Sequence, residues 1–355
     1  MSQSGYRPSI VSLVGAVLDD RYQILSILGE GGMGAVYRAQ TPDGHLVAVK
    51  VLHEELGDNP ELRERFQREI QALFALQHPN VLAAHDFGIV NGSPYLVMEL
   101  LEGQSLDKFI EENPPSPENA LLIMRQILTG LAFAHSMGAV HRDLKTENVF
   151  ITRGPDGNYL AKLLDFGLVK FTDDQKWGSA KKLTMQGSVF GTPAYMAPEQ
   201  CVGAPADART DVYSAGCILF ELLTGEWPFM EESQMGMFQA HLTRTPPTLT
   251  ATRDDLAFRP ELEQLLATSL QKKPQDRFPD ARAMLAALDA IPWPGATTKG
   301  AAQAAAPSAV AAAQPAGGLG APVSIAPPKK SNVGLFVGLA VVALVVLAGL
   351  FAFLK

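Results

Sequence analysis

The chain has 355 residues, of which 47% are hydrophobic and 19% are charged, so it can bury the cores of about two ordinary domains. Its formal net charge is −8, and the sequence contains no basic stripe with interleaved aromatic residues, so we expect no nucleic-acid partner. The two cysteines, Cys201 and Cys217, fit no Cys/His metal-binding spacing and are typical of a reduced compartment.

Residues 1–21 are expected to form an N-terminal extension. Their apolar run, residues 10–18, is short, contains Ser12 and is followed by two aspartates, which is not the pattern of an export signal. Residues 22–52 then alternate short apolar runs with turn residues. The runs ILSILGEGG and GAVYRAQ predict two strands around a glycine turn, and LVAVKVL predicts a third strand.

Apolar residues next recur with helical spacing, at Leu62, Phe66, Ile70, Leu73 and Leu76. The run YLVMEL predicts a further strand, and helical segments begin at SLDKFI and continue between proline-rich turns to Leu288. This order predicts an α+β fold with a small strand-rich lobe, residues 22–101, and a larger helical lobe, residues 102–291.

The C-terminal part has a different composition. Residues 292–332 are rich in Ala, Pro, Gly and Ser and cannot bury enough apolar surface to offset the entropy cost of ordering, so we expect a disordered linker. Residues 333–354 carry no charge, and at ~1.5 Å per residue a helix of this length matches a hydrocarbon layer of roughly 30 Å. With Lys329 and Lys330 before this transmembrane helix, we expect a single-pass C-terminal tail anchor in the plasma membrane and a cytoplasmic folded domain.

The sequence GEGGMG, between the first two predicted strands, satisfies the pattern G-x-G-x-x-G. Glycines allow the backbone to approach a ligand closely and leave N–H groups available to phosphate oxygens. The pattern alone is weak, because an ordinary glycine hairpin is the alternative. A dinucleotide-binding turn would open a helix, whereas a strand follows here.

Lys50 lies among β-branched residues in the third predicted strand, where a buried ammonium group requires a partner. Glu69, next to Ile70 on the apolar side of the following helix, could supply that partner. The alternative is that Glu69 is one more surface carboxylate.

A further group of polar residues lies in HRDLKTENVF, where charged side chains run directly into apolar ones. Asp143 could accept a proton from an attacking hydroxyl, and Asn148 could give an oxygen ligand to a metal ion. Asp165, in LLDFG, is a second hard oxygen ligand suited to Mg²⁺. Each of these residues alone could instead be a loop residue that bonds the local backbone.

The glycine loop, strand lysine, helix glutamate, HRDLKxEN, DFG and APE (residues 197–199) occur in the order found in protein kinases. The chain resembles the eukaryotic-like (Hanks-type) serine/threonine protein kinases over residues 20–290. The runs RYQILSILGEGGMGAVYRA and GTPAYMAPEQ look like the bacterial, membrane-anchored branch. The resemblance implies a two-lobed protein kinase fold and transfer of the γ-phosphoryl group of ATP to protein serine and threonine hydroxyls, with Mg²⁺ or alternatively Mn²⁺.

The resemblance also implies a nucleotide site. Its residues would be Leu28, Gly29, Gly31, Gly32, Gly34, Val36, Ala48, Lys50, Met98, Glu99, Leu101 and Phe150. In that site Lys50, held by Glu69, would bind the α- and β-phosphates.

The catalytic and supporting roles come from the same resemblance. Asp143 would orient and deprotonate the substrate hydroxyl, and Lys145 would steady the transferred group. Asn148 and Asp165 would bind the metal ion. Other positions would support the site: His141, Phe166 and Leu73 in an internal stack, Thr192 against the catalytic loop, Asp211 below that loop, and Arg277 paired with Glu199.

Regulation is implied by Arg142, which in similar kinases binds a phosphate on the activation segment. Thr184 is the preferred site for that phosphate and Ser188 the second, although both could be ordinary loop hydroxyls. We expect protein substrates and self-association for autophosphorylation in trans, which membrane confinement would favour.

Two other functions are compatible with parts of the pattern. A pseudokinase scaffold would signal by shape, but it would lack at least one of four residues that are all present here: Lys50, Asp143, Asn148 and Asp165. A small-molecule kinase of related fold would usually lack the APE segment. One departure from the resemblance is the hairpin in residues 151–164, which is longer than usual and whose GPDG tip is a turn signal that we expect to be solvent-exposed.

Overall fold

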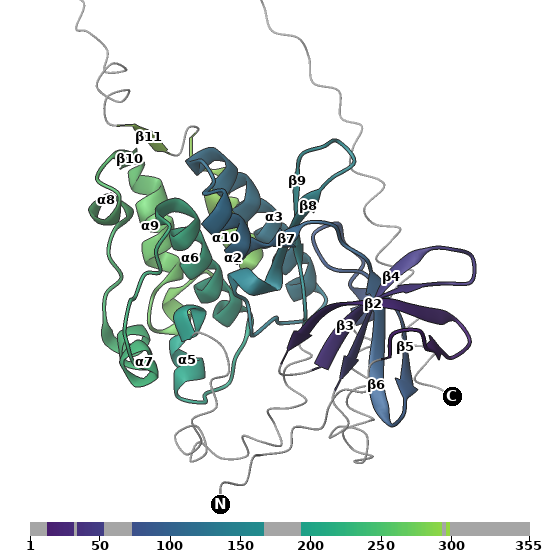
Figure 1. Cartoon of the computed structure of the whole chain (residues 1–355). Helices are drawn as coiled ribbons and strands as arrows, with labels where there is room; N and C mark the ends of the chain where they lie inside the picture. Colours follow the sequence, from purple (N-terminus) through teal and green to yellow (C-terminus); the bar gives the residue numbers. More distant parts are fainter. Residues whose placement is uncertain (1–12, 32–33, 53–72, 167–192, 293–295, 299–355) are drawn as a thin grey trace, which may run out of the picture. The chain divides into compact units, whose positions relative to one another are not determined.

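The computed structural model describes residues 13–31, 34–52, 73–166, 193–292 and 296–298. Within this part of the chain, the small lobe is a six-stranded antiparallel sheet with the order β1-β2-β3-β4-β6-β5 (Figure 1). Its strands are β1 (Val17–Leu18), β2 (Tyr22–Gly31), β3 (Gly34–Gln40), β4 (Leu46–Leu52), β5 (Ala84–Val90) and β6 (Ser93–Glu99).

Two turns of this sheet follow from their sequences. Before β4, Gly44 has φ +89°, and the N–H of Thr41 donates to the carbonyl of His45. Between β5 and β6, Asn91 and Gly92 have φ values of +49° and +82°. Asn-Gly is the favoured pair for such a two-residue hairpin because both central residues need positive φ.

Apolar side chains on the sheet form the core of the small lobe: Leu13, Leu18, Tyr22, Ile24, Ala35, Tyr37, Ala39, Val47, Val49, Val51, Tyr95 and Val97. Leu13 and Leu18 belong to the predicted N-terminal extension but are only 8% and 2% exposed. Strand β1 pairs with the start of β2. Part of the predicted extension therefore contributes to the small-lobe core.

The large lobe is mainly helical. Its helices and short 3-10 turns are α2 (Leu106–Glu112), α3 (Pro117–Ser136), η2 (Thr146–Asn148), η3 (Pro193–Tyr195), α5 (Pro198–Cys201), α6 (Ala208–Thr224), α7 (Gln234–Thr243), α8 (Leu249–Thr252), α9 (Pro260–Ser269), η4 (Pro274–Asp276) and α10 (Ala281–Asp289).

Two small antiparallel sheets accompany these helices. One contains β7 (Gln104–Ser105), β8 (Val149–Arg153) and β9 (Tyr159–Leu163), and the other pairs β10 (Leu256–Phe258) with β11 (Ala296–Thr298). Strand β11 lies within the segment predicted to be a disordered linker. Its three residues are nevertheless paired.

The ends of the long helices carry the expected capping residues. Helix α3 begins with Pro117 after Ser116, whose side chain accepts a hydrogen bond from the N–H of Asn119. Helix α6 begins after Asp207, which caps the N–H of Arg209, and is followed by the C-cap residue Gly225, whose φ of +77° is left-handed.

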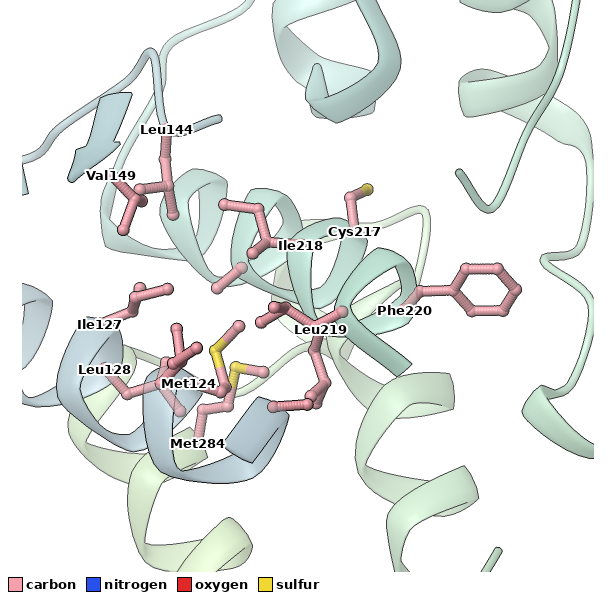
Figure 2. Close-up of a cluster of buried hydrophobic side chains, with 14 of the residues drawn as sticks. Met124, Ile127, Leu128, Leu144, Val149, Cys217, Ile218, Leu219, Phe220 and Met284 are labelled. Atoms are coloured by element: carbon pink, nitrogen blue, oxygen red, sulfur yellow. The ribbon is translucent and has the colours of Figure 1, made fainter. Parts of the chain in front are cut away.

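The core of the large lobe lies where α3, α6 and α10 meet. Figure 2 shows Met124 and Ile127 of α3 beside Ile218 and Leu219 of α6, with Met284 of α10 in the same cluster. All of these residues are fully buried. Burying such apolar side chains stabilises the lobe by about 25 cal/mol for each Å² of surface removed from water.

Leu144 and Val149 also point into this cluster (Figure 2). They are 2% and 0% exposed, and the polar residues 145–148 lie between these two buried apolar positions. The segment is therefore attached to the rigid core on both sides.

Two backbone hydrogen bonds join the residues before β5 to the end of β9. The N–H of Leu163 donates to the carbonyl of Asn80, and the N–H of Leu82 donates to the carbonyl of Leu163. Glu99, at the end of β6, accepts from the N–H of Ala83 and forms an ion pair of 2.7 Å with Lys162 of β9. These contacts connect the two lobes beside the inter-lobe segment.

Among the described residues, no helix is both long and apolar enough to cross a membrane. The predicted membrane helix, residues 333–354, lies outside the described residues.

Candidate functional site

The glycine turn between β2 and β3 has one position that requires glycine for steric reasons. Gly34 has φ +150°, and a Cβ atom there would lie 2.0 Å from the carbonyl oxygen of Val51. At Gly29 and Gly31, in contrast, a Cβ atom would meet nothing within 4 Å. These two positions leave open space beside the backbone, as a phosphate-covering loop would need.

Lys50 of β4 contacts Asp165. Its Nζ lies 2.7 Å from both Oδ1 and Oδ2, and the side chains are 12% and 28% exposed. Asp165 has φ +51°, in the left-handed region. Glu69, the predicted partner of Lys50, lies outside the described residues.

Asp143 is held by its own loop. The amide nitrogen of Asn148 donates to the carbonyl oxygen of Asp143 at 2.7 Å and to its Oδ2 at 2.9 Å. The ammonium group of Lys145 lies 3.3 Å from the same Oδ2. The three residues predicted for proton acceptance, phosphate contact and metal binding therefore form one group, joined by the Asn148 hydrogen bonds and the Lys145 ion pair.

Asp211 supports this loop through its backbone. It is fully buried at the start of α6, and its two carboxylate oxygens accept the N–H groups of His141 and Arg142 at 2.8 Å. The ring of His135 contacts the same carboxylate at 2.9 Å. Each carboxylate oxygen therefore holds one N–H of the HRD segment.

Arg142 has an unusual backbone. Its φ is +66°, which costs a non-glycine residue roughly 1–3 kcal/mol, and both of its peptide groups are bonded: the N–H to Asp211 and the carbonyl to the Gln200 amide. Its side-chain Nε is buried and has no hydrogen-bond partner within the described part of the chain.

His141 and Phe166 are packed against each other, with ring centroids 4.7 Å apart. The Nε2 of His141 is bonded to the carbonyl of Leu164 at 2.8 Å. Leu73 packs against the same large-lobe core that contains Phe166. The three residues predicted to form an internal stack thus border one core.

The predicted adenine-contacting residues come from β2, β3, β4, β6 and β8 and from the segment that follows β6. Ala48 and Met98 are directly opposite each other in the pairing of β4 with β6 and are 5% and 6% exposed. Val36 is opposite Lys50 in the pairing of β3 with β4. Leu28 is 51% exposed on β2, and the remaining members, Glu99, Leu101 and Phe150, are partly buried.

Glu199 and Arg277 form a buried ion pair. Both guanidinium NH groups bond the carboxylate at 2.8 Å, and the side chains are 7% and 0% exposed. Arg277 also donates to the carbonyls of Arg209, Gln271 and Lys272. Burial raises the pKa of Glu199, but its hydrogen bonds and charge interaction with Arg277 outweigh this effect and leave the pKa lowered.

A second buried polar group was not anticipated from the sequence. The Tyr195 hydroxyl donates to Glu221 at 2.6 Å and is bonded to the Thr146 hydroxyl at 2.7 Å. Trp227 Nε1 lies 3.2 Å from both the phenol oxygen and the carboxylate. The sequence does contain one indication of this group. Glu221 is a lone glutamate inside the apolar run ILFELL, and an isolated charge in a buried helix needs hydrogen-bond partners.

The Glu221 carboxyl has no cation among these contacts. Burial raises its pKa to about 7, although the hydrogen bonds from Tyr195 and Trp227 act in the opposite direction. The negative charges of Glu147 and Asp107 raise the pKa further.

Asn148 and Asp165 could supply oxygen ligands to a magnesium ion. Asn148 uses its amide nitrogen toward Asp143, so its amide oxygen is the atom suited to bind a cation, and Asp165 adds a carboxylate. No group of three or more His, Cys, Asp or Glu side chains within the described ranges could hold a metal ion. Two protein oxygens suit Mg²⁺, which usually takes its other ligands from water and phosphates.

Several predicted residues lie outside the described residues, and the structure does not place them: Gly32, Glu69, Thr184, Ser188 and Thr192.

Comparison with known families gives a match over most of the chain. The family model described as protein kinase domain matches residues 22–287.

Several curated bacterial proteins are similar to the chain. The Myxococcus xanthus serine/threonine-protein kinase pkn3 is 39% identical over 287 residues, which cover 80% of this chain and 52% of that protein. The Mycobacterium tuberculosis serine/threonine-protein kinase PknL is 37% identical over 295 residues, which cover 82% of this chain and 70% of that protein. The chain spans about half the length of the first of these relatives.

Solved structures match as well. A crystal structure of the Mycobacterium tuberculosis PknI kinase domain has a TM-score of 0.59 and 29% identity, and the match covers 78% of this chain and 98% of that chain. A structure of Rad53 1-466 in complex with AMP-PNP has a TM-score of 0.61 and 27% identity, and the match covers 75% of this chain and 64% of that chain. These matches confirm the predicted two-lobed fold with a strand-rich and a helical lobe.

Proposed function

The chain belongs to the protein kinase family, in its bacterial eukaryotic-like serine/threonine branch, and we propose that it transfers the γ-phosphoryl group of ATP to serine and threonine hydroxyls of proteins. One observation carries this proposal. The Asp143–Asn148–Lys145 group is complete, and Lys50 and Asp165 are in contact with each other. A scaffold without catalysis would not need all five of these side chains.

The proposed reaction divides the work among these residues. Phosphoryl transfer needs placement and charge neutralisation more than covalent chemistry. Asp143, held by the Asn148 amide, accepts the proton of the attacking hydroxyl as the new P–O bond forms and the bond to the ADP oxygen breaks. Lys145 lies close enough to Asp143 to neutralise the phosphoryl group that passes between the substrates.

Nucleotide and metal binding are part of the same proposal. We propose that Lys50 binds phosphate oxygens and that Asp165 and the amide oxygen of Asn148 hold Mg²⁺, or alternatively Mn²⁺. A bound divalent ion supplies positive charge that neutralises the phosphates. The match to a neighbour crystallised with AMP-PNP supports a nucleotide at the corresponding place.

The adenine ring would lie between the small lobe and Phe150. The register pairing of Ala48 with Met98 places two buried apolar residues side by side near the inter-lobe segment, where they could contact an adenine base. The ion pair of Glu99 with Lys162 holds that segment at its start.

Regulation, self-association and membrane attachment are further proposals. The buried Nε of Arg142 without a described partner supports binding of a phosphate, for which Thr184 is preferred and Ser188 is second. The apolar run in residues 333–354 supports a single-pass anchor that keeps the catalytic domain at the inner face of the plasma membrane. Anchored copies would then phosphorylate one another in trans.

The proposal is tested by incubating the purified full-length chain with ATP and Mg²⁺ and identifying the modified residues by mass spectrometry. We expect phosphoserine and phosphothreonine to form with Mg²⁺ and not to form when EDTA is present during the incubation. Phosphate on Thr184 or Ser188 would support the regulatory proposal. Nucleotide binding without any transferred phosphate would instead support a pseudokinase scaffold.

A further inference from the structure

Thr146 occupies a central place in the catalytic loop. It lies between Lys145 and Asn148, the two residues that contact Asp143, and it is fully buried. Leu144 and Val149 fix the two ends of the segment in the apolar core (Figure 2). Between these ends, the hydroxyl of Thr146 makes the single side-chain hydrogen bond found for it among the described residues, to the phenol of Tyr195 at 2.7 Å.

The direction of this hydrogen bond follows from its neighbours. The single phenol hydrogen of Tyr195 is donated to Glu221 Oε2 at 2.6 Å. The phenol oxygen is therefore an acceptor toward Thr146, whose hydroxyl is the donor. Hydrogen bonds in such a chain polarise one another, which favours one fixed arrangement of the three side chains.

Tyr195 is itself fixed to the large lobe. Its carbonyl accepts from the Ser214 hydroxyl of α6 at 2.8 Å, and its ring packs edge-on against Trp227 at 6.5 Å. Glu221 also lies on α6. The chain of contacts therefore runs from a rigid helix, through Tyr195, to the middle of the catalytic loop.

We infer that Thr146 is a positioning residue for phosphoryl transfer. Its hydroxyl holds the catalytic loop against Tyr195 and thereby fixes the positions of Asp143 and Lys145. The inference rests on the proposed kinase function. It predicts an effect on the chemical step rather than on nucleotide binding, because the side-chain hydrogen bond of Thr146 goes to Tyr195 of the large lobe and none joins it to Lys50 or another described small-lobe residue.

The discriminating change is Thr146→Val, which has nearly the same shape and lacks the hydroxyl. The phenol oxygen still has Trp227 Nε1 as a donor at 3.2 Å, so the substitution leaves no buried polar atom of Tyr195 unpaired. Thr146→Ser retains the hydroxyl and tests rescue. Thr224→Val is the matched control, because Thr224 is also buried, on α6, and bonds only backbone carbonyl and N–H groups.

The experiment measures kcat and KM for ATP with a protein substrate, and the melting temperature, for the full-length wild type and the three variants. We expect Thr146→Val to lower kcat roughly ten-fold with KM for ATP changed less than about two-fold, since small misplacement of reacting groups acts on the bound state. Thr146→Ser should recover most of that loss, and Thr224→Val should keep the wild-type kcat.

A Tyr195→Phe background adds a second criterion. There Thr146→Val should cause no further loss of kcat, since the acceptor is already gone. The inference is overturned by a wild-type kcat in Thr146→Val, by an equal loss in the Ser variant, or by a change confined to melting temperature. An inactive wild type would instead remove the proposed kinase function and, with it, the basis of the inference.

Discussion

The ammonium group of Lys50 lies 2.7 Å from both carboxylate oxygens of Asp165, although the two residues are 115 positions apart. The residue proposed to bind phosphate thus neutralises the residue proposed to bind magnesium. A nucleotide with its metal ion would replace this ion pair by two other contacts between opposite charges. Lys50 would contact phosphate, and Asp165 would contact the cation. The site therefore exchanges one ion pair for two.

Asp165→Asn should lower phosphoryl transfer by about 100-fold or more, because a neutral amide binds Mg²⁺ poorly and no longer compensates the charge of the metal. The measurement is the initial rate over a range of Mg²⁺ concentrations. Asp156→Asn, in the exposed hairpin between β8 and β9, is the matched control and should behave as the wild type. Equal activity of the two variants would contradict the assignment of Asp165 as a metal ligand.

Arg277→Ala should reduce the free energy of unfolding by about 3–5 kcal/mol, because it leaves the Glu199 carboxylate buried without a cation. The matched control is Arg253→Ala, which removes an ion pair of 2.7 Å at the surface and should cost about 0.2–1 kcal/mol. Denaturant unfolding measures both changes. Similar losses in the two variants would show that the Glu199–Arg277 pair does not stabilise the large lobe.

Glu221 should make stability depend on pH. Its pKa in the folded protein is raised from 4.5 to about 7, mainly by burial, while Asp107 and Glu147 are the charged groups that add to the shift. A raised pKa means that the folded state holds a proton which the unfolded chain releases. The contribution of protonated Glu221 to the free energy of unfolding is therefore complete below about pH 4.5. It is lost as the pH rises through about 7, and the total loss is up to ~3 kcal/mol.

The comparison that isolates this effect is wild type against Glu221→Gln, which does not titrate but can still accept from Tyr195. The difference in unfolding free energy, wild type minus variant, should fall between about pH 5 and about pH 8. Parallel pH profiles would mean that Glu221 titrates at its ordinary value. Burial lowers the pKa of His241 to about 4, so this residue makes stability rise with pH. His241 is present in both proteins, so its effect cancels in the difference.

The proposed membrane anchor predicts a loss of membrane association when the chain ends at Pro292. The truncated protein should be found in the soluble fraction and should autophosphorylate more slowly in cells, because it is no longer concentrated at a surface. Fractionation and phosphate analysis at matched expression measure both effects. A truncated protein that stays with membranes, or that autophosphorylates at an unchanged rate, would contradict the anchor or its proposed role.

Much of the fold could be predicted because local patterns and tertiary structure agree. The Asn91-Gly92 turn has the residues that its positive φ values require, and the apolar spacing in α3 and α6 matches the buried core. The pairing of β10 with β11 could not be predicted in this way. It is a backbone ladder within a segment whose Ala- and Pro-rich composition indicates a linker.

The site was predictable where a residue belongs to a recognisable motif. Asp211 and the Glu199–Arg277 pair are present where the motifs lead one to expect them. The Thr146–Tyr195–Glu221 group was not anticipated, because its members are dispersed in the sequence and each looks ordinary in its own segment. Only tertiary structure brings such hydroxyl and carboxyl groups within hydrogen-bond distance.

The most direct measurement of the central claim is transfer of radiolabelled γ-phosphate from ATP to protein by the purified full-length chain, compared with Asp143→Asn. The account predicts label on serine and threonine for the wild type, and at least about 100-fold less for the variant, which lacks the proton acceptor. A wild type that binds nucleotide but labels no protein, or an Asp143→Asn variant with undiminished transfer, would contradict it.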